Sequence, residues 1–283
     1  MRLFKIENGV FIEHQGQVFQ KNIEDWDEYI NRDSLFLFLQ NEIMSLKPIK
    51  GMSSNELAEI KALAPIGSQE LWAAGVTYLR SREARMEESE TSGGADFYDK
   101  VYVAERPELF FKAMANRIVG TNDHLFIRKD SSWNVPEPEL TLFINSKGSI
   151  EAYTIGNDMS SRSIEGENPL YLPQAKVFER CAALGPCLYV TDSPISLKTN
   201  IEIQISRKGR IMYDEQICID QIKRKFEDLV DYLFRECDFA NGCFLMTGTG
   251  LVPADDFTLH VGDEVKIHID PIGTLFNTIS QKS

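Results

Sequence analysis

The sequence of 283 residues predicts an α+β fold that is mostly β, with a small N-terminal unit ahead of a larger domain. Two observations lead to this fold class. From Leu71 onward, short apolar runs bounded by Gly, Asn and Asp dominate, which is typical of strands. Only two segments in that part of the chain have convincing helical periodicity. At roughly 150 residues per domain, the length fits two domains or one large one.

The N-terminal unit begins with short strands. The segments RLFKI, VFIEH and QVF are separated by turns at Gly9 and Gly16. Apolar residues at helical spacing then predict an amphipathic helix over residues 34–46.

A linker follows this helix. Residues 47–54 (KPIKGMSS) have the Pro, Gly and Ser content of a linker, and residues 55–63 could belong to either side. We therefore place the boundary near residue 66 and expect a small domain over residues 1–65 and a larger domain over residues 66–283.

The larger domain contains the two expected helices, over residues 79–90 and 220–236. The second has an apolar face formed by Phe226, Leu229, Val230, Leu233 and Phe234. Between residues 89 and 96 the sequence SETSGGAD is polar and contains glycine. Together with the charged helix before it, this segment is either a mobile lid over a site or a plain surface loop.

The charge of the chain excludes some classes of partner. Lys and Arg number 30 against 43 Asp and Glu, which gives a net charge of -13, the wrong sign for a nucleic-acid binder. No apolar run approaches the roughly 20 residues of a membrane span. The five cysteines show no metal-finger spacing, so we interpret them as reduced thiols of a cytoplasmic protein.

A β-hairpin after Trp133 has a register that can be counted. Alternating apolar residues run up to a short turn at residues 145–148 and away from it again. The pairs predicted by this count are Ile144 with Ser149, Glu139 with Thr154, Glu137 with Gly156, and Val135 with Asp158.

Three carboxylates share one face at the open end of this hairpin. Residues i and i+2 of a strand project to the same side, as do direct partners, so Glu137, Glu139 and Asp158 converge. Pro136 and Pro138 favour an extended backbone around Glu137 and exclude a helix.

Converging carboxylates repel one another, so something must compensate their charge. A hard divalent cation with oxygen ligands does so, and three side chains leave positions open for water and substrate on Mg²⁺ or Mn²⁺. Ca²⁺ is a third candidate. The alternative is a solvated acidic hairpin end, because one β-bulge would turn Asp158 to the other face.

The loop that follows the hairpin favours the metal site, because it is dense in functional groups and poor in apolar ones. These residues are Arg162, Glu165, Glu167, Asn168, Gln174 and Lys176.

The carboxylates of the hairpin and the residues of the loop after it resemble those of the fumarylacetoacetate hydrolase superfamily. The family signature is an E-x-E pair, then N-D-x-S-x-R, then a lysine, which here are residues 137–139, residues 157–162 and Lys176. The resemblance extends over most of the chain, through GVTY (75–78), RPELFFKA (106–113), NRIVG (116–120), ENPLYLPQAK (167–176) and TGTGLVP (247–253). ERPELFFKA and ENPLYLPQAK are similar to the branch that contains 2-keto-3-deoxy-D-arabinonate dehydratase.

The resemblance implies a mixed β-roll catalytic domain behind a small N-terminal domain, and a homo-oligomer, either a dimer or a tetramer. It also implies roles for single residues. It makes Glu137, Glu139 and Asp158 metal ligands, and it makes Lys176 and Glu108 the proton-transfer groups. The substrate-binding residues that we predict with it are Arg82, Arg162, Gln174 and Thr249.

Two departures from the family pattern bear on the reaction. Hydrolase members carry a His-Glu pair after the G-x-x-Y motif to activate water, whereas Tyr78 is followed here by LRSREARMEES, without histidine. The dehydratase branch is expected to have Thr-Pro where this chain has Met114-Ala115, which concerns the identity of the substrate more than the reaction.

The resemblance therefore implies loss of water from a 2-keto-3-deoxy sugar acid, such as an arabinonate or xylonate derivative, giving 2-oxoglutarate semialdehyde. One of Lys176 and Glu108 would remove the C3 proton and the other would protonate the leaving C4 hydroxyl. Two other enzymes remain alternatives: a C-C hydrolase of 2,4-diketo acids and a 2-keto acid decarboxylase. A non-catalytic protein that binds organic acids is the third alternative, and both proton-transfer candidates argue against it.

Overall fold

The computed structural model describes residues 1–52, 57, 62–88 and 95–283, without the side chains of residues 84, 85, 87, 88 and 95–98. Parts of the predicted linker (47–54), of the 55–63 segment and of the 89–96 stretch lie outside the described residues. So does the side chain of Arg85 on the predicted lid helix.

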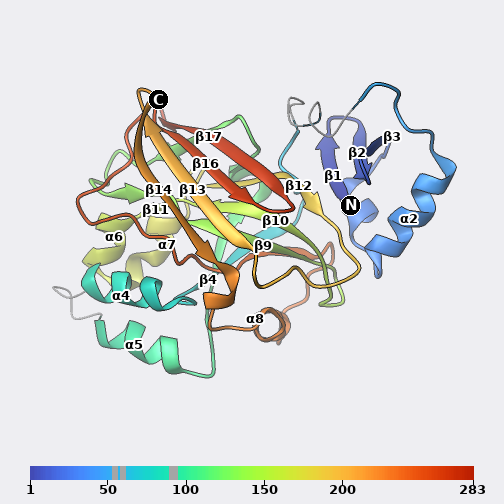
Figure 1. The fold of residues 1–283 in the computed structure, drawn as a ribbon. Helices are drawn as coiled ribbons and strands as arrows, with labels where there is room; N and C mark the ends of the chain where they lie inside the picture. Colours follow the sequence, from blue (N-terminus) through green and yellow to red (C-terminus); the bar gives the residue numbers. More distant parts are fainter. Residues whose placement is uncertain (53–56, 58–61, 89–94) are drawn as a thin grey trace.

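The largest element is a ten-stranded mixed sheet that runs through the molecule (Figure 1). Its strands follow the order β3-β2-β1-β12-β10-β9-β15-β4-β5, and the short β6 pairs with β12. The strands are β1 (Arg2–Ile6), β2 (Gly9–His14), β3 (Gln17–Lys21), β4 (Glu70–Gly75), β5 (Glu108–Met114), β6 (Ile118–Val119), β9 (Pro138–Ile144), β10 (Ile150–Asp158), β12 (Ala182–Tyr189) and β15 (Cys243–Met246).

A second sheet of five strands packs against this one, in the order β14-β13-β16-β17-β7. Its strands are β7 (His124–Ile127), β13 (Asn200–Arg207), β14 (Arg210–Cys218), β16 (Glu264–Ile269) and β17 (Gly273–Gln281). A small two-stranded sheet joins β8 (Asn134–Val135) to β11 (Ser160–Ser161).

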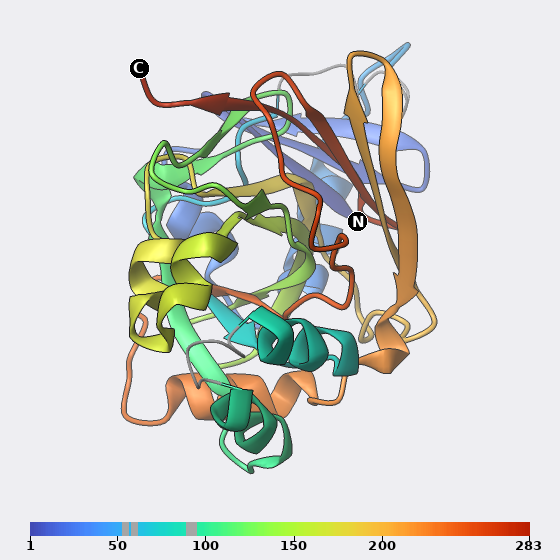
Figure 2. The ribbon, with the colours of Figure 1, turned by 90° about the vertical axis from the view of Figure 1, so that its left-hand side faces the viewer.

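Short helices cover the outside of the sheets. They are α1 (Trp26–Ile30), α2 (Leu35–Ser45), α4 (Leu79–Glu88), α5 (Ala95–Val103), α6 (Arg162–Glu167), α7 (Leu172–Lys176) and α8 (Phe226–Phe234), with the 3-10 turns η1 (Ala115–Arg117), η2 (Pro169–Tyr171) and η3 (Ile219–Gln221). Helix α4 contacts both α5 and α6, α6 contacts α7, and Figure 2 shows these helices on one side of the molecule. None of the helices in the described part of the chain is both long and apolar enough to cross a membrane.

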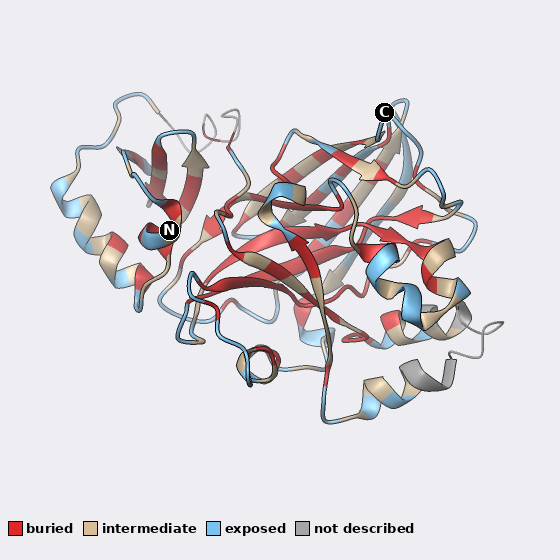
Figure 3. Ribbon diagram, turned by 180° about the vertical axis from the view of Figure 1, so that it is seen from behind, coloured by how far each residue is buried: buried red, intermediate tan, exposed pale blue. Residues whose placement is uncertain are grey.

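The central strands are buried on both faces (Figure 3). On β9, Leu140, Leu142 and Ile144 belong to the core between the two sheets. The side chain of Phe143 points to the opposite face and joins the core that includes Leu35 of α2. Alternate residues of one strand therefore supply two separate cores, as the period of two dictates.

The N-terminal strands are part of the large sheet, because β1 pairs with β12 at Arg2–Tyr189 and Leu3–Leu188. Figure 1 shows this N-terminal part, with helix α2, at one side of the molecule. The domain boundary near residue 66 stays a prediction, and the shared sheet means that its two sides are hydrogen-bonded to each other.

The predicted N-terminal helix (34–46) is confirmed by α2, and the described part of the predicted helix 79–90 is helical as α4. The predicted helix 220–236 is shorter than expected and consists only of α8 after a 3-10 turn. The reason is tertiary: the Lys223 N–H donates to the Thr77 carbonyl (2.9 Å), and the Arg224 guanidinium donates to the Val101 carbonyl (3.0 Å).

The predicted hairpin forms between β9 and β10, but the counted register is wrong by two residues. The loop has five residues (145–149) rather than four, because Ile144 pairs with Ile150. One bulged residue, Glu151, then lies before the pair Phe143–Ala152. Each shift of one residue would turn the strand over, and two shifts restore the face. The predicted common face is therefore present, although the predicted pairs are not.

Candidate active site

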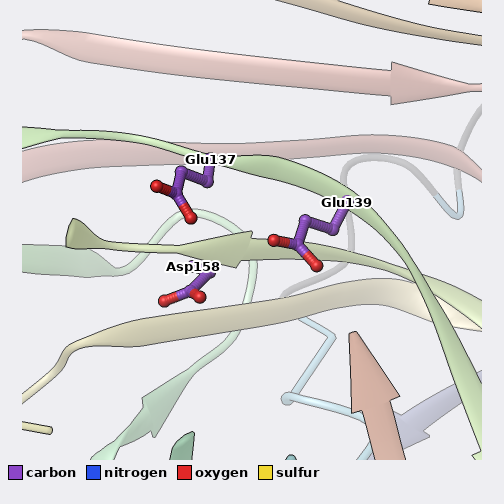
Figure 4. A group of neighbouring side chains, drawn as sticks. All are labelled: Glu137, Glu139 and Asp158. Carbon is purple, nitrogen blue, oxygen red and sulfur yellow. The ribbon is translucent and has the colours of Figure 1, made fainter. Parts of the chain in front are cut away.

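The open end of the β9–β10 hairpin holds the three predicted carboxylates. Glu137, Glu139 and Asp158 are each at most 5% exposed, and one ligand oxygen from each lies within 4.8 Å of the others. Figure 4 shows the three side chains pointing toward one another. Three oxygens at such distances form one side of a coordination site for a hard cation.

Local backbone pairing creates this convergence. The Asp158 N–H donates to the Glu137 carbonyl (2.9 Å), so these two residues lie opposite each other, closer than the counted register predicted. Glu139 lies opposite Gly156. A Cβ on Gly156 would lie 2.4 Å from Thr141 Oγ1, so only glycine leaves the space that this face needs.

Two cations hold Glu137. Lys176 Nζ lies 2.5 Å from Glu137 Oε2, and Arg162 Nη2 lies 2.8 Å from Glu137 Oε1. All three residues are buried. Helix α6 begins at Arg162 and helix α7 ends at Lys176, so the loop predicted to be rich in functional groups does deliver two of them to the site.

Asp158 is also held by two cations. Lys176 Nζ lies 3.0 Å from Asp158 Oδ2, and Lys112 Nζ lies 2.6 Å from Asp158 Oδ1. Burial by itself would raise the pKa of Asp158, but the charges of Lys112 and Lys176 hold that pKa below its ordinary value. Asp158 is therefore ionised and oriented before any metal binds.

Glu139 differs from the other two carboxylates. Its Oε2 accepts a hydrogen bond from the Gly248 N–H (2.5 Å), but among the described residues no Lys or Arg lies within ion-pair distance of it. Burial, and then the charges of Asp158 and Glu137, raise the pKa of Glu139 well above its ordinary value. This carboxylate lacks a positive partner that a bound cation would supply.

Sequence reasoning missed Lys112, which is fully buried. Its Nζ donates to the carbonyls of Met159 (2.9 Å) and Lys176 (2.5 Å) as well as contacting Asp158. Lys112 is the extra residue of a β-bulge in β5, a feature that commonly re-aims side chains near active sites. The signal available in the sequence was a single lysine inside the apolar run ELFFKAM.

Glu108 lies at the start of β5, opposite Gly75. A Cβ on Gly75 would lie 2.1 Å from Glu108 Oε2, so the glycine provides the room for this carboxylate. Glu108 Oε2 is buried, and no group in the described part of the chain donates a hydrogen bond to it. A buried oxygen of this kind is available to a ligand or a proton.

A small cavity of about 20 Å³ lies among these groups, which is room for about one water molecule. Three predicted residues, Lys176, Arg162 and Thr249, line it together with the carboxylates. The complete lining is Ala74, Gly75, Val76, Ser81, Phe110, Glu137, Glu139, Asp158, Arg162, Lys176, Gly248 and Thr249.

Two predicted substrate-binding residues lie elsewhere. Arg82 Nη2 pairs with Asp99 Oδ1 (2.7 Å), which turns the guanidinium toward α5. Gln174 is exposed on α7 and is not part of the cavity lining. Periodicity could place both residues on the correct elements, but it could not show which way each side chain turns.

The donor set fits a hard divalent cation such as Mg²⁺. All three ligands are carboxylates, which this class of ion prefers, and Glu139 lacks a cationic partner. Lys112, Lys176 and Arg162 pair with Glu137 and Asp158, whereas none of these three cations is within ion-pair distance of Glu139 among the described residues.

Comparison with known proteins agrees with this chemistry. The family described as fumarylacetoacetate (FAA) hydrolase C-terminal matches residues 93–280. A probable 2-keto-3-deoxyxylonate dehydratase of Haloferax volcanii is 46% identical over 221 residues, covering 77% of this chain and 75% of that protein. A 2-dehydro-3-deoxy-D-arabinonate dehydratase of Saccharolobus solfataricus is 40% identical over 235 residues, covering 82% and 78% of the two chains.

A solved structure is similar over the whole chain. It is 2-keto-3-deoxy-D-arabinonate dehydratase in complex with magnesium and 2,5-dioxopentanoate. The TM-score is 0.86 at 31% identity, and the alignment covers 100% of this chain and 99% of the other. This likeness confirms the predicted fold class.

Proposed function

Because this chain belongs to the fumarylacetoacetate hydrolase family, we propose that it is a Mg²⁺-dependent dehydratase of a 2-keto-3-deoxy sugar acid. The product is 2-oxoglutarate semialdehyde, also called 2,5-dioxopentanoate. The observation that carries this proposal is the buried carboxylate triad beside Lys176 and Glu108, in a chain 40–46% identical to two dehydratases. The family resemblance found in the sequence is thus confirmed.

Glu137, Glu139 and Asp158 are the residues that we assign to the metal. When bound there, Mg²⁺ supplies Lewis-acid polarisation of the substrate 2-keto group. Lys176 and Arg162 hold the Glu137 carboxylate in position through their ion pairs with its two oxygens.

Lys176 and Glu108 are the residues that we assign to proton transfer. Lys176 Nζ lines the cavity, and Glu108 Oε2 lies buried against Gly75, which also lines it. One group takes the C3 proton and the other protonates the C4 hydroxyl, which leaves as water. The unsaturated product then rearranges to the aldehyde, so the overall loss is one molecule of water.

The lid helix supports dehydration over hydrolysis. A hydrolase needs a base that activates a water molecule beside the substrate. Of the described side chains of α4, Ser81 lines the cavity, whereas Glu83 is exposed and lies 3.8 Å from Arg80. The Ser81 hydroxyl already donates to the Tyr78 carbonyl (2.7 Å). Neither residue is placed as the base that a hydrolase requires.

An assay on two substrate classes tests this function. Purified protein with Mg²⁺ is given 2-keto-3-deoxy-pentonates and acylpyruvates, and the products are followed by NMR. We expect 2,5-dioxopentanoate from a deoxy-pentonate and loss of turnover when a chelator removes the metal. Faster turnover of acylpyruvates than of every deoxy-aldonate tested would instead support the hydrolase.

The proposal extends to the setting in which the enzyme works. The described cysteines are all free thiols, which supports a reducing compartment such as the cytoplasm. A homo-oligomer, dimer or tetramer, is proposed from the family resemblance, and size-exclusion chromatography with light scattering tests it.

A further inference from the structure

The turn between β4 and α4 has a backbone conformation that its residues do not favour. Val76 has a φ of +52°, which is a strained, left-handed conformation for a β-branched residue. It is buried and lines the same cavity as the carboxylates. A strained residue of this kind persists only where its surroundings impose the conformation, and such residues cluster at functional sites.

Contacts of the next residue impose it here. The Thr77 hydroxyl donates to the Thr247 carbonyl (2.7 Å), and the Thr77 carbonyl accepts from the Lys223 N–H (2.9 Å). Gly248 packs directly on this turn, because a Cβ there would lie 2.0 Å from Thr77 Oγ1. The turn is therefore fixed from both sides, and Gly248 also donates its N–H to Glu139.

The strained turn leaves two backbone donors unused. Among the described residues, neither the Val76 N–H nor the Thr77 N–H donates a hydrogen bond, although both residues are buried. Buried backbone N–H groups are nearly always paired. Successive N–H groups in a turn with a left-handed residue form a concavity that binds anions. An anionic oxygen bound in the cavity that Val76 lines would supply the missing partner.

The cationic side chains nearby are already engaged by the protein. Lys112, Lys176 and Arg162 contact the triad, and Arg82 pairs with Asp99. A substrate carboxylate that enters the cavity also meets three carboxylates of the protein. Neutral N–H donors can hold it without taking a cation away from them.

We propose that the N–H groups of Val76 and Thr77 bind an oxygen of the substrate 1-carboxylate. This rests on the proposed function, since it takes the substrate to be a 2-keto acid. The Thr77 hydroxyl then has a positioning role, because it fixes the turn, whereas the Thr77 N–H contacts the substrate. Such a site selects for a carboxylate next to the keto group.

NMR of the labelled enzyme tests the contact directly. Protein labelled with ¹⁵N-valine is titrated in the presence of Mg²⁺ with pyruvate, a 2-keto acid without a leaving hydroxyl, and with methyl pyruvate, which lacks the carboxylate. The Val76→Ile variant, which keeps the N–H, assigns the Val76 signal by its disappearance. We expect a downfield shift of the Val76 amide proton with pyruvate only.

Two results would overturn the proposal. One is an unchanged Val76 signal, whether or not pyruvate inhibits the enzyme at the same concentration. The other is an equal shift with methyl pyruvate. Both are independent of turnover, so they are distinct from failure of the proposed function, which would appear as a wild type that dehydrates no deoxy-aldonate.

A pair of variants tests the positioning role. Thr77→Val keeps the N–H but removes the hydroxyl that holds the turn, and we expect KM to rise about tenfold, the size of one lost hydrogen bond. Thr154→Val is the matched control, because its buried hydroxyl also donates to a backbone carbonyl, that of Gly185 (3.3 Å). We expect a lower Tm in both variants and a raised KM only in Thr77→Val. A KM that is unchanged in Thr77→Val, or that rises equally in both, would contradict the positioning role.

Discussion

The two ends of the β9–β10 hairpin hold carboxylates in opposite ways. At the tip, Glu151 accepts hydrogen bonds from the N–H groups of Ser34 (3.3 Å) and Leu35 (2.9 Å) and from the Asn145 amide (3.0 Å). These donors are neutral, and the carboxylate is only half-buried. At the open end, three buried carboxylates lie close together, and two of them, Glu137 and Asp158, contact three cations. Neutral hydrogen-bond donors can stabilise one carboxylate that is still partly hydrated. Three carboxylates buried away from water also need positive charges nearby.

The pKa directions separate the two ends further. Burial raises the pKa of Glu151, while the N–H groups of Leu35 and Ser34 oppose that rise. Burial also raises the pKa of Glu139, and there the charges of Asp158 and Glu137 add to it. A bound cation would therefore stabilise the ionised carboxylate more at the open end than at the tip. The same strand pair thus makes a structural contact at one end and carries the proposed metal ligands at the other.

The largest expected effect comes from removing one carboxylate charge at each end. Glu139→Gln should abolish dehydration, because it removes a charged ligand at nearly constant volume. Glu151→Gln, the matched control at the tip, should keep activity within about twofold, because surface changes away from a site are usually mild. Steady-state kinetics with saturating Mg²⁺ measures both. Comparable losses in the two variants would remove the distinction between the two ends.

Lys176→Met isolates proton transfer at the open end. Turnover should fall by roughly a hundredfold to ten-thousandfold, the usual range for a lost general acid or base. Circular dichroism and metal analysis serve as controls that the protein is folded and loaded. Near-normal turnover would reduce Lys176 to a counter-ion of Glu137 and Asp158.

Lysines at the two ends should differ in their effect on stability. Lys112→Met removes one of two cations from buried Asp158, and we expect the free energy of unfolding to drop by about 3 kcal/mol. Lys147→Met breaks the exposed pair with Asp33 at the tip, and we expect a change of less than about 1 kcal/mol. Urea denaturation measures both, and equal effects would contradict the contrast.

The smallest expected effect is a pH dependence of stability in the metal-free protein. The pKa of Glu139 is raised on folding above its ordinary value of 4.5, so the folded state binds its proton more tightly. The contribution of protonated Glu139 to folding stability is fully present below pH 4.5, and it is lost as the pH rises through the pKa of Glu139 in the folded state. The Tm of wild type relative to Glu139→Gln should therefore fall with rising pH, and added Mg²⁺ should reverse the fall. A Tm difference between wild type and Glu139→Gln that stays constant or grows with pH would show that the pKa of Glu139 is not raised in the folded protein.

The common face of Glu137, Glu139 and Asp158 could be predicted from the sequence even though the counted register was wrong. Facing depends only on whether a register shift is odd or even, and the longer loop and the bulge at Glu151 add up to an even shift. The pairs themselves could not be predicted, because loop length and bulges depend on contacts across the fold. One such contact ties Glu151 to the first residues of α2.

The directions of side chains at bulges and between packed helices could not be predicted from the sequence. Lys112 enters the site because a bulge turns it inward, and no periodicity indicates that bulge. Arg82 is on the predicted helix, but Asp99 of the next helix turns it away from the cavity. The roles of Glu108, Arg162, Lys176 and Thr249 were predicted with the family resemblance, and the fold brings all four residues to the cavity or beside it.

Binding of Mn²⁺, followed by electron paramagnetic resonance, tests the contrast between the hairpin ends most directly. Wild type and Glu151→Gln should each bind one Mn²⁺ per chain, and Mg²⁺ should displace it. Glu139→Gln should bind none at the same concentrations, because it removes the one carboxylate of the three that has no Lys or Arg partner among the described residues. A wild type that binds no Mn²⁺, or a Glu139→Gln variant that binds it as tightly as wild type, would contradict the metal site at the open end.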